Sequence, residues 1–421
     1  MRLLLLVDCY YPSVKSSAKL MHDLAADFHS RSNEVIVLTP CDSVKDEMVV
    51  SNEDGVIVAR VRTRKIKGAG KISRAFEEAR LSATLWNKAK DFLRRNPCDV
   101  IIFYSPTIFW GGLVRKLKAL WNCPAYLILR DIFPEWAVNA GVLRKGLVYR
   151  FFRSKEIQQY ETADLIGVQS PANLDYFARN FPSRRYPVEV LYNWTVLAEP
   201  DLPVTGYRQT LGLQDKVVFV YGGNLGVAQD VDNILRLAQR TAVNANIYFL
   251  LVGEGSEAAR LKKSIIEKEL QNIRVLPAME QREYLSMLSE FDVGLISLDR
   301  RLKTQNLPGK LLGYMYWGMP ILASINPGND LFDLLGKNKA GLCFVNGDDD
   351  GPAGAALRLA DDREFRVRMG KESRRLLERM FSAEAAVNNI LEHLSKAARS
   401  SVRLSEALED NALAQINSRQ L

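Results

Sequence analysis

The sequence has no hydrophobic run long enough to cross a membrane. Residues 3–7 are apolar, but Asp8 follows them, and a bilayer-spanning helix needs ~20 apolar residues. A secretory leader would need about 7–15 apolar residues and a small-residue cleavage site, and the N-terminal region shows neither. We therefore expect no leader, no transmembrane segment and a cytoplasmic location.

Cysteine and histidine are scarce and dispersed. None of the five cysteines belongs to a CxxC pair, which favours reduced, buried thiols. The three histidines show no HxxxH spacing, so we expect no metal site. Neither GxSxG nor GxxxxGK[ST] occurs, which argues against an α/β-hydrolase and a P-loop enzyme. We expect no cofactor.

Negative charge is scarce in one region. The 421 residues include 57 Lys and Arg against 49 Asp and Glu, a net charge of +8. Residues 60–155 alone contain 21 basic and six acidic side chains. This concentration predicts an anionic partner: a membrane surface, a lipid phosphate, a nucleotide or a nucleic acid. No nucleic-acid-binding module is recognisable, so we expect no nucleic acid.

Short apolar segments alternate with longer amphipathic ones along the chain. Several short segments are apolar on both faces, as parallel strands covered by helices are, and the alternation predicts βαβ units. The expected strands span residues 3–7, 34–39, 56–61, 100–104, 126–129, 165–168 and 188–191, then 217–221, 247–252, 273–276, 293–297, 321–323 and 342–345.

The pattern restarts after a linker near residues 193–211, which contains Pro200, Pro203 and Gly206. The sequence therefore predicts an α/β protein of two doubly wound, Rossmann-like domains, residues 1–195 and 205–380, facing each other across a cleft. Such sheets bind ligands beyond the carboxyl ends of their strands. We expect a helix over residues 381–398 that packs back on the first domain, and a polar tail over residues 399–421.

A glycine-rich turn follows the expected strand 217–221. It reads Tyr221-Gly222-Gly223-Asn224-Leu225-Gly226 and precedes an expected helix. Glycines let the backbone turn tightly and come close to a ligand, and a helix start offers unpaired N–H groups. The turn favours a phosphate or diphosphate site, and an ordinary strand-to-helix turn is the alternative. Its spacing differs from the dinucleotide pattern GxGxxG, which argues against NAD.

Two other turns place a charged residue beside glycine. Lys310 follows Pro308 and Gly309 at the start of an expected helix, where the helix dipole disfavours a cation unless an anion neutralises it. Glu254 lies in a Gly-Glu-Gly turn after the strand 247–252, where its carboxylate could bind sugar hydroxyls. The alternatives are a solvated lysine and a carboxylate that compensates a helix start.

Charged residues also follow the expected strand 126–129, at the edge that faces the predicted cleft. These residues are Arg130, Asp131 and Glu135. Asp131 or Glu135 could orient an acceptor hydroxyl or act as a base. An arginine–carboxylate pair that fixes the loop is the alternative.

Together these motifs resemble the retaining GT-B glycosyltransferases of family 4. The resemblance covers about residues 1–395 and points to bacterial enzymes of O-antigen and capsule assembly, including the N-acetyl-L-fucosaminyl-transferase type. Such enzymes carry Gly-Asn-x-Gly-x-Ala-Gln, here residues 223–229, and Pro-Ser-Lys, here Pro308-Gly309-Lys310. They also carry Arg-Asp-x-x-Pro-Glu, here residues 130–135.

The resemblance implies transfer of a sugar, such as an N-acetylated deoxyamino sugar, from a UDP-sugar to a polyprenyl-diphosphate-linked saccharide. Retention of anomeric configuration without a metal is implied, with Lys310 as the cation of the diphosphate. The implied donor-binding residues are Gly222, Gly223, Asn224, Gly253, Glu254, Met279, Glu283, Pro308, Gly309 and Lys310. The implied catalytic residues are Asp131, Glu135 and Lys310, and the implied acceptor-binding residues are Ser13, Lys15, Ser16, Ser17 and Arg130.

Several family positions are occupied differently in this chain. Asn224 and Gln229 stand where arginine and lysine are usual, and Gln305 and Gly313 replace a Glu-x7-Glu pair. Two alternatives therefore stay open: a nucleotide-sugar 2-epimerase of the same architecture, and a non-catalytic sugar-nucleotide-binding scaffold of a polysaccharide assembly complex.

Basic residues are interleaved with aromatic ones inside the positive region. Residues 62–67 form a cationic run, and residues 109–121 and 150–155 mix Arg and Lys with Phe and Trp. This mixture is typical of an interfacial helix on an anionic leaflet. We expect peripheral binding to the cytoplasmic face of the inner membrane, and a solvated charged face over core aromatics is the alternative.

Overall fold

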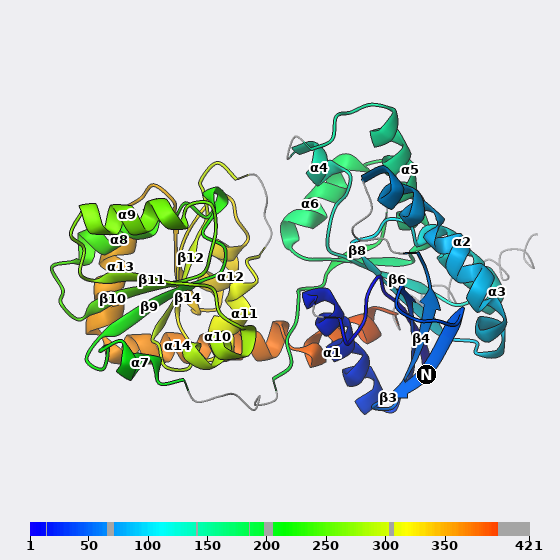
Figure 1. The fold of residues 1–421 in the computed structure, drawn as a ribbon, viewed down its shortest axis with the longest axis horizontal. Helices are drawn as coiled ribbons and strands as arrows, with labels where there is room; N and C mark the ends of the chain where they lie inside the picture. The colour runs from blue at the N-terminus through cyan, green and yellow to red at the C-terminus, as the bar shows by residue number, and fades with distance from the viewer. Residues whose placement is uncertain are drawn as a thin grey trace, which may run out of the picture. The chain divides into compact units, whose positions relative to one another are not determined.

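The computed structural model describes residues 1–13, 15–64, 71–139, 142–184, 186–197, 205–302 and 307–394, with side chains omitted at 71–77 and 139. Its contacts divide the chain into two compact units (Figure 1). Unit 1 comprises Met1–Asn193 and the segment from Ala383 onward, and unit 2 comprises Trp194–Ser382. The predicted tail, Gln305 and the basic residues at 65 and 67 lie outside the described residues.

Unit 1 is built on an eight-stranded sheet in the order β3-β4-β2-β1-β5-β6-β7-β8. Its strands are β1 (Arg2–Leu6), β2 (Glu34–Cys41), β3 (Met48–Glu53), β4 (Val56–Arg62), β5 (Val100–Ser105), β6 (Ala125–Leu129), β7 (Leu165–Val168) and β8 (Val188–Val190). Its helices are α1 (Ser16–Ser30), α2 (Lys71–Arg95), α3 (Gly111–Trp121), α4 (Glu135–Asn139), α5 (Leu147–Thr162) and α6 (Pro171–Asn180). Neighbouring strands pair in parallel except β3 and β4, which form an antiparallel edge.

The core of unit 1 lies on both sides of its central strands. Four of the five residues of β1 and all those of β5 and β6 are buried. Trp110, just before α3, is fully buried, and its Nε1 donates to the Tyr104 carbonyl oxygen, 2.9 Å away. Phe109 and Leu117 are buried as well. The expected surface role is therefore wrong for Phe109, Trp110 and Leu117, because these side chains form the core beneath the exposed Arg115 and Lys116.

The segment after unit 2 returns to unit 1. Residues 383–394 are helical, and Asn389 donates from Nδ2 to the Val190 carbonyl oxygen, 3.0 Å away. Arg31, directly after α1, donates to Asn388 at 2.5 Å. His393 pairs with Glu189 next to β8. The buried Ile390 and Val387 supply the apolar side of this packing.

Unit 2 has a six-stranded parallel sheet in the order β11-β10-β9-β12-β13-β14. The strands are β9 (Val217–Gly222), β10 (Ile247–Val252), β11 (Ile273–Leu276), β12 (Val293–Ser297), β13 (Ile321–Ile325) and β14 (Gly341–Val345). Counted along unit 2 this is the order 3-2-1-4-5-6, the doubly wound arrangement in which a ligand site lies where the strand order reverses.

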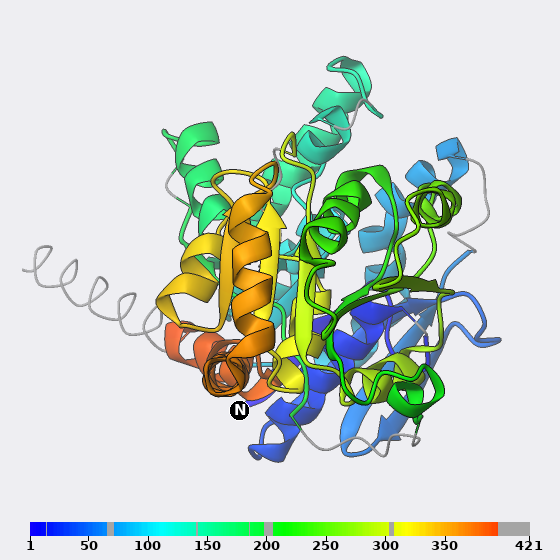
Figure 2. The ribbon, with the colours of Figure 1, turned by 90° about the vertical axis from the view of Figure 1, so that its left-hand side faces the viewer.

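Helices cover both faces of the unit 2 sheet (Figures 1 and 2). They are α7 (Tyr207–Thr210), α8 (Val231–Thr241), α9 (Ala258–Glu267), α10 (Gln281–Leu288), α11 (Lys310–Tyr316), α12 (Leu331–Lys337), α13 (Asp350–Asp361) and α14 (Arg363–Met380), with a 3₁₀ turn η1 (Val227–Gln229). Figure 1 shows α8, α9 and α13 on one face and α10, α11 and α14 on the other. In the described part of the chain, no helix combines the length and hydrophobicity of a membrane span.

Candidate functional site

A cavity of about 790 Å³ opens at the carboxyl ends of four neighbouring strands of unit 2. The strand order reverses between β9 and β12, and the cavity lies beyond these two strands together with β10 and β11. Its lining residues are Gly222, Gly223, Asn224, Ala228, Gln229, Val252, Gly253, Glu254, Ala278, Met279, Gln281, Tyr284, Leu298, Leu302, Leu307, Pro308, Gly309 and Lys310. The volume is within the range of small-ligand pockets.

The turns after β9 and β10 pack directly on each other at glycines. Gly223 has a φ of 122° and Gly253 a φ of 155°, a region that side chains with a Cβ rarely adopt. A Cβ on Gly253 would lie 1.8 Å from the Gly223 carbonyl oxygen. The Gly223 N–H donates to the Val252 carbonyl oxygen at 2.9 Å. The close packing of these turns leaves backbone at the cavity wall, where a ligand can approach it.

Lys310 is held in the cavity by the packing of α11. The Tyr314 ring covers Gly294, where a Cβ would overlap it, so the helix lies close to β12. The Tyr314 hydroxyl accepts from the Gly222 N–H and donates to the Leu295 carbonyl oxygen, both at 3.1 Å. Trp317 Nε1 donates to the Leu285 carbonyl oxygen at 2.7 Å. These contacts fix the first turn of α11 beside β9.

The Lys310 ammonium lies against an aromatic ring with no carboxylate beside it. Its Nζ is 3.9 Å from the centroid of the Tyr221 ring, close to Gly223. Among the described residues it forms no ion pair. Burial lowers the pKa of the Lys310 ammonium to about 8, because desolvation disfavours the charged form. An anion in the cavity would stabilise the charged form and raise this pKa.

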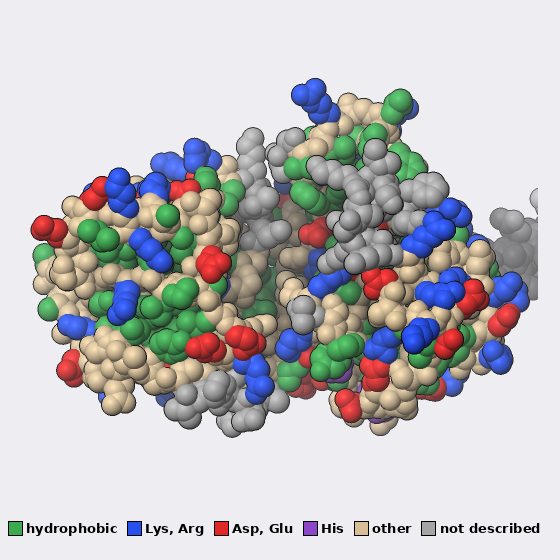
Figure 3. All heavy atoms as spheres, viewed as in Figure 1, with side chains coloured by type: hydrophobic (Ala, Val, Ile, Leu, Met, Phe, Trp, Pro, Cys, Tyr) green, Lys and Arg blue, Asp and Glu red, His purple; other side chains and the backbone are tan. Residues whose placement is uncertain are grey.

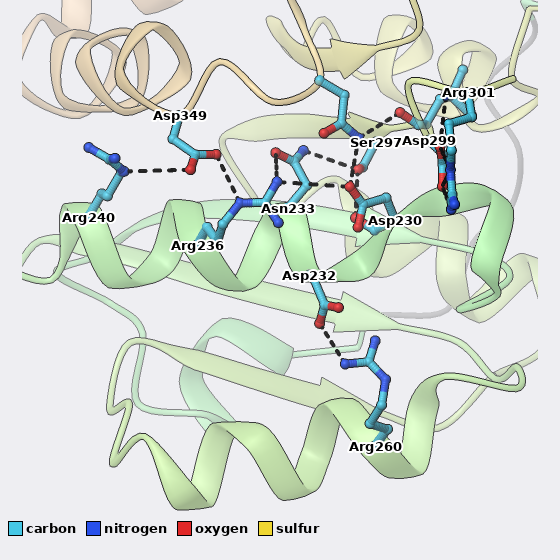
Figure 4. Close-up of polar contacts among 12 residues, drawn as sticks. Asp230, Asp232, Asn233, Arg236, Arg240, Arg260, Ser297, Asp299, Arg301 and Asp349 are labelled. Atoms are coloured by element: carbon cyan, nitrogen blue, oxygen red, sulfur yellow. Dashed lines mark hydrogen bonds and ion pairs between the residues drawn. The ribbon is translucent and has the colours of Figure 1, made fainter.

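A polar network surrounds Asp230, the residue that directly follows Gln229 (Figure 4). Asp230 has a left-handed φ of 39°, and its carboxylate accepts from Asn346 Nδ2 at 2.9 Å. Ser297 at the end of β12 donates to the Asp230 carbonyl oxygen, 3.1 Å away. Asn224 Nδ2 donates to Gln229 Oε1 at 3.2 Å. The network therefore positions the glycine turn and leaves neutral amides at the cavity.

Nine of the ten predicted donor residues line this cavity, and Glu283 does not. Glu283 Oε1 instead accepts a hydrogen bond of 2.6 Å from the hydroxyl of Tyr207 on α7. Gln281 and Tyr284 of the same helix line the cavity in its place. A helix turns by about 100° per residue, so neighbouring positions point in different directions.

Sequence reasoning missed the aromatic and aliphatic part of the wall. The missed residues are Tyr284, Leu298, Leu302 and Leu307. The Tyr284 hydroxyl lies over Gly222, where a Cβ would overlap it, so Gly222 is needed for this contact. A usable signal existed for Leu298, because it directly follows β12, whose carboxyl end borders the reversal point of the sheet.

In unit 1 the predicted loops lie at the carboxyl edge of the sheet. Asp8 follows β1 and Asp131 follows β6, on either side of β5. Burial raises the pKa of the Asp131 carboxyl, Arg130 opposes that shift, and the Asp8 charge adds to it. Lys15 pairs with Asp8 at 3.8 Å. Sequence reasoning named Asp131 and Lys15 but not Asp8.

Ser13, Ser16 and Ser17 lie in and beside the loop that leads into α1. Ser17 Oγ is 3.2 Å from Cys9 Sγ, and the Ser13 N–H donates to the Tyr10 carbonyl oxygen at 3.1 Å. These contacts order the loop, and its role in acceptor binding stays a prediction.

Arg130 and Glu135 have structural contacts of their own. The buried Arg130 guanidinium donates to the Leu191 carbonyl oxygen at 2.6 Å, and burial lowers its pKa to about 10. Glu135 on α4 accepts from the Tyr149 hydroxyl at 2.9 Å and pairs with Lys145 at 3.6 Å. Within the described ranges, no group of three His, Cys, Asp or Glu side chains is placed to hold a metal ion.

Comparison with solved structures shows the fold class. Sucrose-phosphate synthase of Thermosynechococcus elongatus is similar over 95% of this chain and 100% of its own, with a TM-score of 0.65 and 16% identity. HepE of Anabaena in complex with UDP is similar over 94% of this chain and 100% of its own, with a TM-score of 0.63 and 15% identity. WaaG, a glycosyltransferase involved in lipopolysaccharide biosynthesis, is similar over 92% of this chain and 99% of its own, with a TM-score of 0.57 and 13% identity. The two Rossmann-like domains are thus those of the GT-B glycosyltransferase fold.

Sequence comparison identifies the domain that contains the cavity. Residues 205–376 match the family model "Glycosyl transferases group 1", so unit 2 carries a domain of this group. WbjE of Pseudomonas aeruginosa, named as a glycosyltransferase, is 26% identical over 222 residues, 51% of this chain and 54% of its own. WcaI of Escherichia coli (strain K12) is named as a colanic acid biosynthesis glycosyl transferase. It is 26% identical over 238 residues, which are 53% of this chain and 57% of its own. The matched region spans only about half the length of these relatives.

Proposed function

We propose that this protein is a retaining glycosyltransferase of bacterial surface polysaccharide assembly. It would move a sugar, such as an N-acetylated deoxyamino sugar, from a UDP-sugar to a polyprenyl-diphosphate-linked saccharide. The names of WbjE and WcaI support the reaction class, and the UDP complex of HepE supports the nucleotide. The group 1 domain supports placing the donor in unit 2.

One observation carries the donor assignment. The desolvated ammonium of Lys310, which has no described counterion, lies at a cavity whose wall includes the backbone of Gly223 and Gly253. Such a group is costly unless an anion reaches it. A diphosphate would supply that charge, whereas an uncharged ligand would leave the ammonium unpaired.

Sugar transfer would use this arrangement as follows. The bond between the anomeric carbon and the β-phosphate oxygen breaks, and its electron pair stays on the phosphate oxygen. An acceptor hydroxyl oxygen bonds to the same face of that carbon, and its proton passes to the departing phosphate. Lys310 stabilises the charge that develops on the leaving diphosphate. Acceptor recognition is assigned to unit 1, with Asp131 as the predicted group that orients the hydroxyl.

A transfer assay tests the proposal. Purified protein is incubated with several UDP-sugars, with and without a polyprenyl-diphosphate-linked saccharide, and products are identified by mass spectrometry. Glycosylated lipid and free UDP, formed only when acceptor is present, are expected, and NMR of the new linkage gives its anomeric configuration. An altered sugar nucleotide released without acceptor would indicate an epimerase, and UDP-sugar binding without turnover would indicate a scaffold.

Affinity for UDP should fall in alkaline solution. The pKa of Lys310 is lowered to about 8 in the free protein, and a bound diphosphate raises it, so binding takes up a proton above that pH. Linkage then predicts a dissociation constant that is flat from pH 6.5 to 7.5 and rises by up to about tenfold per pH unit above pH 8. Titration calorimetry measures it. Lys310→Met should bind more weakly with a flat profile over the same range, and an unchanged slope would contradict the assignment.

Removal of divalent cations should leave transfer intact. In the proposed reaction the positive charge at the leaving diphosphate comes from Lys310 and backbone N–H groups rather than from a metal ion. We expect initial rates in EDTA to be within about twofold of those with added Mg²⁺ or Mn²⁺. A catalytic metal ion would contribute several kcal/mol to the transition state, and the proposed reaction uses none. A rate that collapses in EDTA and returns with one added cation would refute this part of the proposal.

A lipid-linked acceptor is embedded in a bilayer, so we also propose that the protein associates peripherally with the cytoplasmic face of the inner membrane. The excess of basic residues over 60–155 supports this, because anionic lipids attract basic protein surfaces.

A further inference from the structure

The segment Trp136 to Phe151 exposes an unusual number of large apolar side chains. Val142 is 71% exposed and Leu147 82% exposed. Trp136 on α4, and Val148 and Phe151 on α5, are exposed as well. Large apolar groups gathered on a surface indicate a site of interaction, whereas scattered ones need no explanation. We call Trp136, Val142, Leu147, Val148 and Phe151 the α4–α5 face.

The α5 part of this face has the spacing of one helix side. Leu147, Val148, Phe151 and Lys155 follow at i, i+1, i+4 and i+8, which places them along one stripe of α5. The buried residues of α5, among them Glu156, Gln159 and Tyr160, lie in the second half of the helix. The exposed Leu147, Val148 and Phe151 lie in its first half, so the apolar stripe is separate from the part of α5 that contributes to the core.

Cations surround the apolar side chains. From Val142 to Lys155 the chain contains five basic residues, Arg144, Lys145, Arg150, Arg153 and Lys155, and no acidic one. Next to the face, a hollow of about 630 Å³ is lined by Arg115, Arg150, Arg153, Lys155 and Arg184, with Glu161 as the one carboxylate in its lining. Figure 3 shows blue and green side chains at the end of unit 1 that carries α4 and α5.

The acidic groups near the hollow are already paired. Glu156 accepts from Arg153 at 2.6 Å, and Glu161 pairs with Arg184. Among the described residues, Arg115 and Arg150 form no ion pair, and Lys155 contacts the Phe151 ring, 5.9 Å from its centroid, and Gln158. The hollow thus has an excess of positive charge that an external anion could neutralise.

We propose that the α4–α5 face is the surface by which this protein docks on an anionic lipid bilayer. Its apolar side chains enter the boundary between head groups and acyl chains, and the cations of the hollow bind lipid phosphates. A second copy of the chain is a poorer occupant, because a symmetric contact would bring the same cations together. The inference deepens the proposed membrane association and does not depend on the donor site.

Vesicle co-sedimentation tests the docking surface. We expect binding to vesicles of phosphatidylcholine with phosphatidylglycerol at low salt, weaker binding at high salt, and little binding to phosphatidylcholine alone. The double variant Leu147→Glu and Phe151→Glu should bind vesicles at least tenfold more weakly, since it replaces two apolar side chains that would enter the bilayer with two charged ones. Equal binding by this variant would overturn the proposal.

A matched variant controls for the added charge. Val243→Glu with Ile266→Glu changes two apolar side chains of unit 2 that are 88% and 76% exposed, so it adds the same charge away from the face. It should bind vesicles like the parent protein, and a loss equal to that of the α4–α5 variant would show that net charge alone governs binding. The variant Arg115→Gln with Arg150→Gln should weaken binding and flatten its salt dependence.

Two further readouts separate the possible failures. Trp136 fluorescence should shift to shorter wavelength on vesicle binding, and Trp136→Phe should remove most of that shift. Light scattering should show a monomer with or without the Leu147→Glu and Phe151→Glu changes, whereas a dimer that these changes dissociate would assign the face to self-association. UDP affinity should be unchanged in every face variant. Normal vesicle binding without UDP binding would refute the donor proposal alone.

Discussion

Lys310→Met is expected to remove most sugar transfer without weakening the fold. A charge-assisted hydrogen bond contributes about 1.5–3 kcal/mol, so losing the ammonium should lower kcat/KM about tenfold to a hundredfold. The unliganded variant should melt at the same or a higher temperature, because the ammonium is desolvated and its pKa is lowered to about 8. Transfer rates with a UDP-sugar and a lipid-linked acceptor measure the first effect, and differential scanning calorimetry measures the melting temperature.

The combination of these two effects distinguishes a binding lysine from a structural one. Lys263→Met is the matched control, since Lys263 lies on α9 of the same unit, its side chain is 75% exposed, and its one ion pair among the described residues is the i,i+4 pair to Glu267. It should alter stability by less than about 0.5 kcal/mol and leave transfer unchanged. A Lys310→Met protein that transfers sugar at the parent rate would remove the donor assignment.

Gly253→Ala is expected to damage both stability and donor binding. The φ of 155° at Gly253 strains any residue with a Cβ, at about 1–3 kcal/mol, and the Cβ would collide with the Gly223 carbonyl oxygen, at about another 1–3 kcal/mol. For a unit of this size the melting temperature should fall by roughly 5–15 °C. Because the two turns must separate, UDP affinity should also fall at least tenfold.

Gly354→Ala is the comparison for this substitution. Gly354 is exposed on α13, and a Cβ there would meet no atom within 4 Å. Alanine in a helix interior is favoured over glycine by about 0.5–1 kcal/mol, so this variant should be slightly more stable than the parent and bind UDP normally. If Gly253→Ala behaved like Gly354→Ala, the tight packing of the β9 and β10 turns would be excluded.

The fold could be anticipated wherever the strands are apolar on both faces. The thirteen expected strands all occur. In the fully buried ones, such as β5, β6 and β12, burial by helices on both sides leaves a clear apolar run in the sequence. The antiparallel β3 was missed, since its residues Met48–Glu53 alternate between intermediate and exposed positions at the sheet edge. The helix α13 has no clear helical pattern in the sequence, because Gly351, Pro352 and Gly354 are poor helix formers. Its buried alanines and Leu359 stabilise it through tertiary packing.

The sequence predicted the glycine turns and the lysine of the candidate site but not the aromatic and aliphatic side chains of its wall. Glycine turns after strands, and a lysine at a helix start, can be recognised locally. Local patterns could not reveal Tyr284 and Leu302 at the cavity, or Asp8 close enough to Asp131 to affect its pKa, because each depends on which elements the topology brings together. The distinction between the buried Phe109, Trp110 and Leu117 and the exposed α4–α5 face depended on packing in the same way.

The sequence by itself determined the two parallel-sheet domains, the glycine turns and the position of Lys310, because strand periodicity and turn chemistry act over a few neighbouring residues. Only the tertiary structure decided that Lys310 is desolvated beside Tyr221, that Glu283 bonds to Tyr207 instead of lining the cavity, and which apolar side chains stay exposed. Burial and pKa depend on atoms that lie far apart in the chain, so no local pattern contains them.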